Sequence, residues 1–142
     1  MNDEREVGYV CVNRRGGLLG RCVMEEKRDL RERTKTYALR IIRLYSSLPK
    51  SSEAQVLGRQ VLRSGTSVGA HYREAYRSRS PAEFVAKIEG GLQELEETAY
   101  WLELLVDASI VPEKRMADLL NETDELIAIF ASSAKPAKNR NK

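Results

Sequence analysis

Four arginines carry the clearest chemistry in this 142-residue chain; they are Arg59, Arg63, Arg73 and Arg77. At about 100° per residue in a helix, they fall within a stripe about 80° wide. Guanidinium groups make planar, bidentate contacts with phosphate or carboxylate groups. The stripe therefore predicts a phosphate-binding surface, with a solvated charged helix face as the alternative.

Charge is distributed unevenly along the chain. Residues 27–87 hold 14 Lys and Arg against 5 Asp and Glu, a net of +9, whereas residues 88–125 hold 2 against 11, a net of −9. The whole chain carries only +3 at pH 7. A basic half beside an acidic half predicts a surface that faces a polyanion, a self-complementary contact between subunits, or both.

The sequence contains no motif or cluster of residues suited to catalysis or metal binding. The single histidine, His71, cannot build a site of several imidazoles, and the helical carboxylates lack the Glu-x-x-His spacing of di-iron bundles. His71 and Glu74 could form a proton-transfer pair, although an interhelical hydrogen-bonding role suits His71 better. We expect no enzymatic activity, no metal and no cofactor.

Length and composition predict one soluble domain with its own core. No apolar run approaches the ~20 residues that span a bilayer, and acidic residues at positions 3, 4 and 6 argue against a signal peptide. The two cysteines, Cys11 and Cys22, give no disulfide framework. We therefore expect a cytoplasmic protein without a membrane partner.

Apolar residues recur with helical spacing throughout, and no strand pattern occurs. The first helix is expected over 29–48, ended by Pro49. The others run from a cap at Ser51 or Ser52 to 77, from a Ser80 capping box to 107, and from Pro112 to 135. Short loops between four helices predict an all-α fold, an up-down-up-down antiparallel four-helix bundle.

One apolar stripe on each helix is expected to form the core. The stripes comprise Tyr37, Ile41, Leu44, Tyr45 and Leu48; Ala54, Leu57, Val61, Val68, Tyr72 and Ala75; Phe84, Ile88, Leu92, Leu95, Ala99, Leu102 and Val106; and Met116, Leu119, Leu120, Leu126, Ile127 and Phe130. Trp101 and Leu104 point away from the core stripe of the third helix. With Tyr100 and Ile129 they predict an oligomer interface.

Residues 63–70 are poor helix material, because each glycine costs about 1 kcal/mol relative to alanine. Their small side chains would let a neighbouring helix or Trp101 approach closely; a simple kink is the alternative. The segment does not fit a phosphate loop, because the pattern has no preceding strand and no following lysine.

The two ends of the chain differ from the middle. Residues 1–23 show no sustained period and no caps, which predicts a leader that is disordered or not physiological, with Met24 as a candidate start. A hairpin through Gly16-Gly17 is the alternative. The four-helix bundle is expected over 24–135, followed by a disordered basic tail over 136–142.

Several segments resemble the signature of the four helix bundle protein family. They are residues 53–60, 63–75, 82–84, 94–97 and 100–102, together with Ser80 and Lys87. The family includes proteins encoded by intervening sequences of large-subunit (23S) ribosomal RNA genes, and the accessory variability determinant of diversity-generating retroelements. The resemblance covers residues 29–134. The chain departs from it at His71, where relatives usually carry asparagine, and in its leader.

The resemblance implies a homopentameric barrel, and the retroelement accessory protein is a basic pentamer that binds nucleic acid and a reverse transcriptase. We therefore expect a non-enzymatic homo-oligomer that binds RNA or DNA, with a protein partner such as a reverse transcriptase. The expected contact residues are Arg40, Arg43, Arg59, Arg63, Arg73, Arg77 and Lys87, extended by Lys35. The alternative is a structural or protein-interaction module whose basic and acidic halves pair between subunits.

Overall fold

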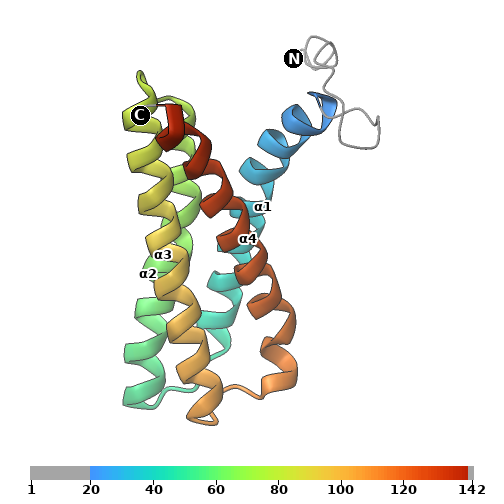
Figure 1. The fold of residues 1–142 in the computed structure, drawn as a ribbon. Helices are drawn as coiled ribbons and strands as arrows, with labels where there is room; N and C mark the ends of the chain where they lie inside the picture. The colour runs from blue at the N-terminus through green and yellow to red at the C-terminus, as the bar shows by residue number, and fades with distance from the viewer. Residues whose placement is uncertain (1–19, 141–142) are drawn as a thin grey trace. The chain divides into compact units, whose positions relative to one another are not determined.

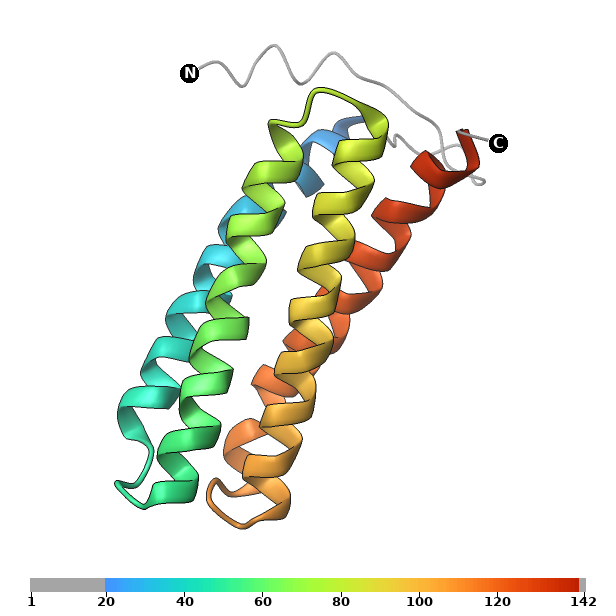
Figure 2. The ribbon, with the colours of Figure 1, turned by 90° about the vertical axis from the view of Figure 1, so that its left-hand side faces the viewer.

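The computed structural model describes the backbone of residues 20–140 and the side chains of residues 30–135. It contains four α-helices, α1 (Gly20–Ser47), α2 (Ser52–Tyr76), α3 (Pro81–Asp107) and α4 (Glu113–Arg140), and no strand among the described residues. Contacts divide the chain into residues 1–33 and 34–142. Within the second unit, neighbouring helices run antiparallel and are joined by short loops (Figures 1 and 2). The predicted all-α, up-down-up-down bundle is confirmed.

Side-chain caps begin two helices where the sequence predicts them. Ser51 Oγ accepts a hydrogen bond from the Ala54 amide at 3.4 Å, and Ser80 Oγ accepts one from the Glu83 amide at 3.1 Å. The Glu83 carboxylate accepts in return from the Arg79 amide at 2.9 Å, one residue before the cap. These bonds satisfy amide groups that a helix start leaves without partners.

Two predicted helix ends are wrong. The first helix begins at Gly20 rather than at residue 29, and α4 continues through Pro136 to Arg140. Residues 25–29 are all charged and lack an apolar stripe, so periodicity alone starts the helix too late. Proline bends a helix as well as ending one. The leader up to residue 19, with its possible hairpin, lies outside the described residues, as do the side chains of both cysteines and of the tail.

The core contains apolar side chains from all four helices. Those at most 1% exposed include Tyr37, Ile41, Val61, Val68, Ala75, Ile88, Leu95, Leu102, Leu105, Met116, Leu126 and Phe130. Several residues predicted for the core are only half-buried; these are Leu44, Tyr45, Leu57, Leu120 and Ile127.

The predicted core stripe of α3 is displaced to one side. Ile88, Leu95 and Leu102 are buried as expected, but Phe84, Leu92, Ala99 and Val106 are only half-buried. The buried stripe instead includes Val85, Gly91, Thr98 and Leu105. Gly91 and Thr98 belong to this buried stripe but are not counted as apolar residues, so a search for apolar spacing does not find the stripe.

Buried hydroxyl groups link the helices in pairs. The Tyr37 hydroxyl of α1 lies 2.7 Å from Thr123 Oγ1 of α4, which itself donates to the Leu119 carbonyl at 2.8 Å. Tyr37 is therefore the donor, and its burial raises the pKa of its phenol. On the other side of the bundle, Ser64 of α2 accepts from Thr98 of α3 at 2.7 Å. These bonds satisfy polar groups inside the core.

Glycines set the spacing between α1 and α2. A Cβ on Gly58 would lie 2.6 Å from Leu48 Cδ1, and a Cβ on Gly65 would lie 2.7 Å from Ile41 Cγ1. Gly69 faces Thr34 in the same way, at 3.2 Å. The small residues of 63–70 therefore admit α1 rather than Trp101 at these glycines, and α2 continues through the segment without a break.

We predict that Gly65→Ala destabilises the protein. The alanine would gain about 1 kcal/mol of helix propensity, but overpacking against Ile41 costs about 1–3 kcal/mol, because that side chain is fully buried and has no room to move. Urea unfolding should therefore show a lower midpoint. Gly69→Ala is the matched control and should stay closer to wild type. A midpoint for Gly65→Ala at or above that of wild type would contradict this packing.

Candidate nucleic-acid interface

The residues predicted to bind phosphates lie at the surface of α1, α2 and α3, except Arg77, which directly follows α2. Those that are exposed are Arg43, Arg59, Arg63, Arg73 and Arg77, whereas Arg40 and Lys87 are half-buried. The structure does not gather them into one site. It separates cations that have carboxylate partners from cations that have none within the described part of the chain.

Two of the predicted cations bind carboxylates of the same chain. Arg63 of α2 donates to Glu97 of α3 at 2.7 Å and lies 3.4 Å from Glu94. Lys87 of α3 lies 2.8 Å from Glu74 of α2, and this ammonium holds the pKa of the Glu74 carboxyl below its usual range. Exposed pairs of this kind add little stability. Each ion pair nevertheless neutralises part of the charge of its cation, so Arg63 and Lys87 attract an external anion less strongly than an unpaired cation would.

A hollow of about 360 Å³ lies between α1 and α2. We call it the α1–α2 hollow; its lining is Thr34, Lys35, Ala38, Thr66, Gly69, Ala70 and Arg73. Most of these side chains are small, while Lys35 and Arg73 bring positive charge from opposite helices. The small side chains leave room for a phosphate group between the two cations.

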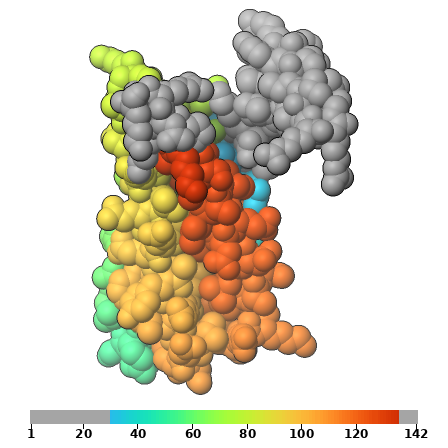
Figure 3. Space-filling model, in the orientation of Figure 1, coloured from blue at the N-terminus to red at the C-terminus, as the bar shows by residue number. Residues whose placement is uncertain are grey.

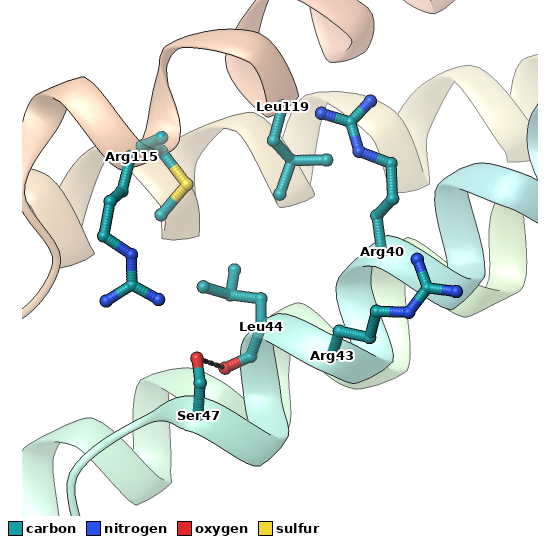
Figure 4. Close-up of a pocket in the computed structure, with 7 residues that line it drawn as sticks. Arg40, Arg43, Leu44, Ser47, Arg115 and Leu119 are labelled. Atoms are coloured by element: carbon teal, nitrogen blue, oxygen red, sulfur yellow. Dashed lines mark hydrogen bonds between the residues drawn. The ribbon is translucent and has the colours of Figure 1, made fainter.

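A second hollow of about 400 Å³ lies between α1 and α4 (Figure 4). This α1–α4 hollow is lined by Arg40, Arg43, Leu44, Ser47, Arg115, Met116 and Leu119. The sequence prediction included Arg40 and Arg43 but missed Arg115. Arg115 lies within the strongly acidic segment 88–125, so a search for basic stretches passes over it.

The acidic segment forms a separate face on α3 and α4, the helices in front in Figure 3. Exposed carboxylates on these two helices include Glu96, Glu103, Asp107, Asp118, Asp124 and Glu125. The basic half of the sequence consequently becomes the α1–α2 side of the bundle, and the acidic half becomes the α3–α4 side. Arg63 and Lys87 bind carboxylates at the border between them.

The predicted oligomer interface is only partly exposed. Tyr100 is 53% exposed and its ring lies 5.1 Å from that of Trp101, whereas Trp101, Leu104 and Ile129 are half-buried. The Nε1 atom of Trp101 is buried and has no hydrogen-bond partner among the described residues.

Val56 joins this region, although the sequence prediction did not include it. It lies seven residues, about two turns, before Arg63 on α2. Trp101 and Leu104 lie seven residues after Glu94 and Glu97, the two partners of Arg63 on antiparallel α3. Val56, which is 52% exposed, therefore lies at the level of Trp101 and Leu104. We call Val56, Tyr100, Trp101 and Leu104 the apolar patch.

His71 packs between helices. A Cβ on Gly90 of α3 would lie 2.9 Å from the imidazole ring, and Nδ1 is buried without a hydrogen-bond partner among the described residues. Glu74, the other member of the candidate proton-transfer pair, binds Lys87 instead.

The described part of the chain contains no group of three or more His, Cys, Asp or Glu side chains that could hold a metal ion. Within the same part, none of the helices is long and apolar enough to span a bilayer.

Fold and surface define a four-helix bundle with a basic α1–α2 side and an acidic α3–α4 side. The model of the 23S rRNA-intervening sequence protein family matches residues 26–132, and the chain belongs to this family. It is also similar to the crystal structure of a protein with unknown function from the S23 ribosomal protein family of Bacteroides thetaiotaomicron. That match has 34% identity and a TM-score of 0.72, and it covers 77% of this chain and 97% of the other. A search of curated proteins returns no match.

Proposed function

We propose that this protein is a non-enzymatic, oligomeric bundle that binds the phosphate backbone of RNA or DNA through its α1–α2 side. The observation that carries the proposal is a set of cations without a carboxylate partner among the described residues; they are Lys35, Arg40, Arg43, Arg59, Arg73 and Arg77. Surface arginines and lysines of most proteins lie among carboxylates, whereas here the carboxylates are concentrated on the opposite side.

Binding of this kind is expected to depend strongly on salt and weakly on sequence. Each phosphate neutralised by a cation releases counterions, and phosphate contacts carry no base information. The name of the family links its members with ribosomal RNA, which makes structured RNA the first polyanion to test.

The oligomer is part of the proposal, with five subunits taken from the family resemblance. The apolar patch and Ile129 would supply the contact between subunits. Oppositely charged sides suit a head-to-tail ring, in which one surface meets a different surface of the neighbour and the rotation closes. A ring would also repeat the basic side around its circumference, so several weak phosphate contacts would act together. A protein partner such as a reverse transcriptase remains an expectation from the family resemblance, and a cytoplasmic location remains an expectation from the sequence.

A second candidate function is a structural or protein-interaction module. It is favoured by the same separation of charge, because the basic side of one subunit could bind the acidic side of the next. High salt distinguishes the two functions: it would dissociate the subunits of such a module, but would release only the ligand of a nucleic-acid-binding oligomer.

We predict that Arg73→Gln weakens binding to structured RNA and duplex DNA and reduces the salt slope by about 1, because one phosphate contact is lost. Fluorescence anisotropy between 50 and 200 mM salt, a range in which such contacts respond strongly, measures both quantities. Lys114→Gln on α4 removes the same charge away from the α1–α2 side and is the matched control. Equal losses in the two variants, or wild-type affinity no higher than that of an unrelated protein of similar charge, would contradict the proposal.

We predict a homopentamer that depends on the apolar patch. Light scattering at micromolar concentration and moderate salt should give five times the mass of one chain. Tyr100→Glu should lower that mass, because it places a charge in the contact. Tyr76→Glu alters a similarly exposed tyrosine on α2, outside the patch, and should leave the mass unchanged. A wild-type monomer, or equal effects of both variants, would overturn this assembly.

A further inference from the structure

The α1–α4 hollow has positive charge on two sides and an apolar floor. Figure 4 shows Arg115 of α4 on one side and Arg40 and Arg43 of α1 on the other, with Leu44 and Leu119 between them. The remaining lining residues are Ser47 and Met116. Two helices that are distant in sequence thus bring three arginines around one space of about 400 Å³.

None of these arginines has a charged partner among the side chains of residues 30–135. No carboxylate lines the hollow, and among the described residues no ion pair or hydrogen bond involves the guanidinium of Arg40, Arg43 or Arg115. Arg63, by contrast, binds two carboxylates. Like charges repel one another more strongly beside an apolar surface, because the local dielectric is lower there than in water. The hollow therefore favours a ligand that carries more than one negative charge.

The floor adds a second requirement for the ligand. Met116 and Leu119 are buried and Leu44 is half-buried, so they form an apolar surface held by the core. The Ser47 hydroxyl donates to the Leu44 carbonyl at 2.9 Å, which leaves its oxygen available only as an acceptor. The hollow is open to solvent, and its volume of about 400 Å³ lies at the lower end of the range of about 300–1,000 Å³ for small-molecule sites. It would hold a compact organic anion rather than a bare ion.

Phosphate monoesters satisfy both requirements better than carboxylates do. A monoester carries a charge of about −1.5 to −2 near neutral pH and three acceptor oxygens, whereas a carboxylate carries one charge and two oxygens. Arginine forks match phosphate geometry. A nucleobase supplies the flat body that the apolar floor can cover.

We propose that the α1–α4 hollow binds a nucleoside phosphate monoester, with the phosphate between Arg40, Arg43 and Arg115 and the base against Leu44. The ligand is either a free mononucleotide or the 5′-phosphorylated end of a strand, and only the second source rests on the proposed function. Arg115 is thereby assigned a role in ligand binding.

Calorimetric titration of the full-length protein with adenosine 5′-monophosphate tests the site. This nucleotide should bind more tightly than adenosine, inorganic phosphate or succinate, and Arg115→Gln should weaken its binding about tenfold, the equivalent of about 1.4 kcal/mol. Arg115→Lys should recover only part of the loss, because it restores charge without the planar fork. Arg79→Gln, at an exposed position between α2 and α3, removes the same charge outside the hollow and should change little. Equal binding of adenosine, inorganic phosphate or succinate, or equal losses in Arg115→Gln and Arg79→Gln, would overturn the site.

Two oligonucleotides of one sequence, ending in a 5′-phosphate or a 5′-hydroxyl, distinguish the two sources. Tighter binding of the phosphorylated strand, lost in Arg115→Gln, identifies a strand end as the ligand. If the nucleotide binds and the two strands bind equally, the ligand is the free nucleotide and the site is supported. If neither strand binds but the nucleotide does, the proposed function fails and this site stands. If both strands bind equally and the nucleotide does not bind, this site is overturned and the proposed function stands.

Discussion

The close approach of α1 to α2 at Gly58 and Gly65 is the contact on which the surface of this bundle depends. Both positions lack the Cβ that would collide with α1, so Leu48 and Ile41 reach the backbone of α2. The buried bond from Tyr37 to Thr123 ties the same helix to α4. Because α1 is held on both flanks, it supplies cations to two hollows, one shared with α2 and one shared with α4. Packing in the core thus determines where positive charge gathers at the surface.

Ion pairs within the bundle then divide the surface cations into two groups, those with carboxylate partners and those without one among the described residues. At the border of α2 and α3, Arg63 and Lys87 lie against carboxylates of the neighbouring helix, so these cations belong to the bundle itself. Six cations have no such partners among the described residues, and the proposed function assigns them to an external anion; they are Lys35, Arg40, Arg43, Arg59, Arg73 and Arg77. A net charge near zero conceals this arrangement, since the opposing carboxylates lie on α3 and α4. Family membership establishes the fold and leaves the ligand to be found by such local arguments.

Sequence reasoning predicted the existence and number of the helices, because apolar spacing and caps such as Ser80 are local signals. It failed where the decisive signal was not local. Gly91 and Thr98 are core residues only because Phe130 and Ser64 lie opposite them, and neither residue type counts as apolar in a periodic pattern. Likewise, Arg115 joins Arg40 and Arg43 only through the packing of α1 against α4. The predicted arginine stripe is exposed as expected, but no pattern within α2 shows that Arg63 binds carboxylates of α3.

The most direct test of this account is the guanidinium NMR spectrum of the protein, with each arginine assigned, recorded while single-stranded polynucleotide is added. Uncompensated cations should bind first, so the Nε–H signals of Arg43 and Arg73 are expected to shift at low ligand concentration. Arg63, held by Glu94 and Glu97, should shift least. Uniform shifts of all three signals would mean that internal pairing does not decide where the anion binds. Shifts confined to Arg63, or absent altogether, would contradict the central claim.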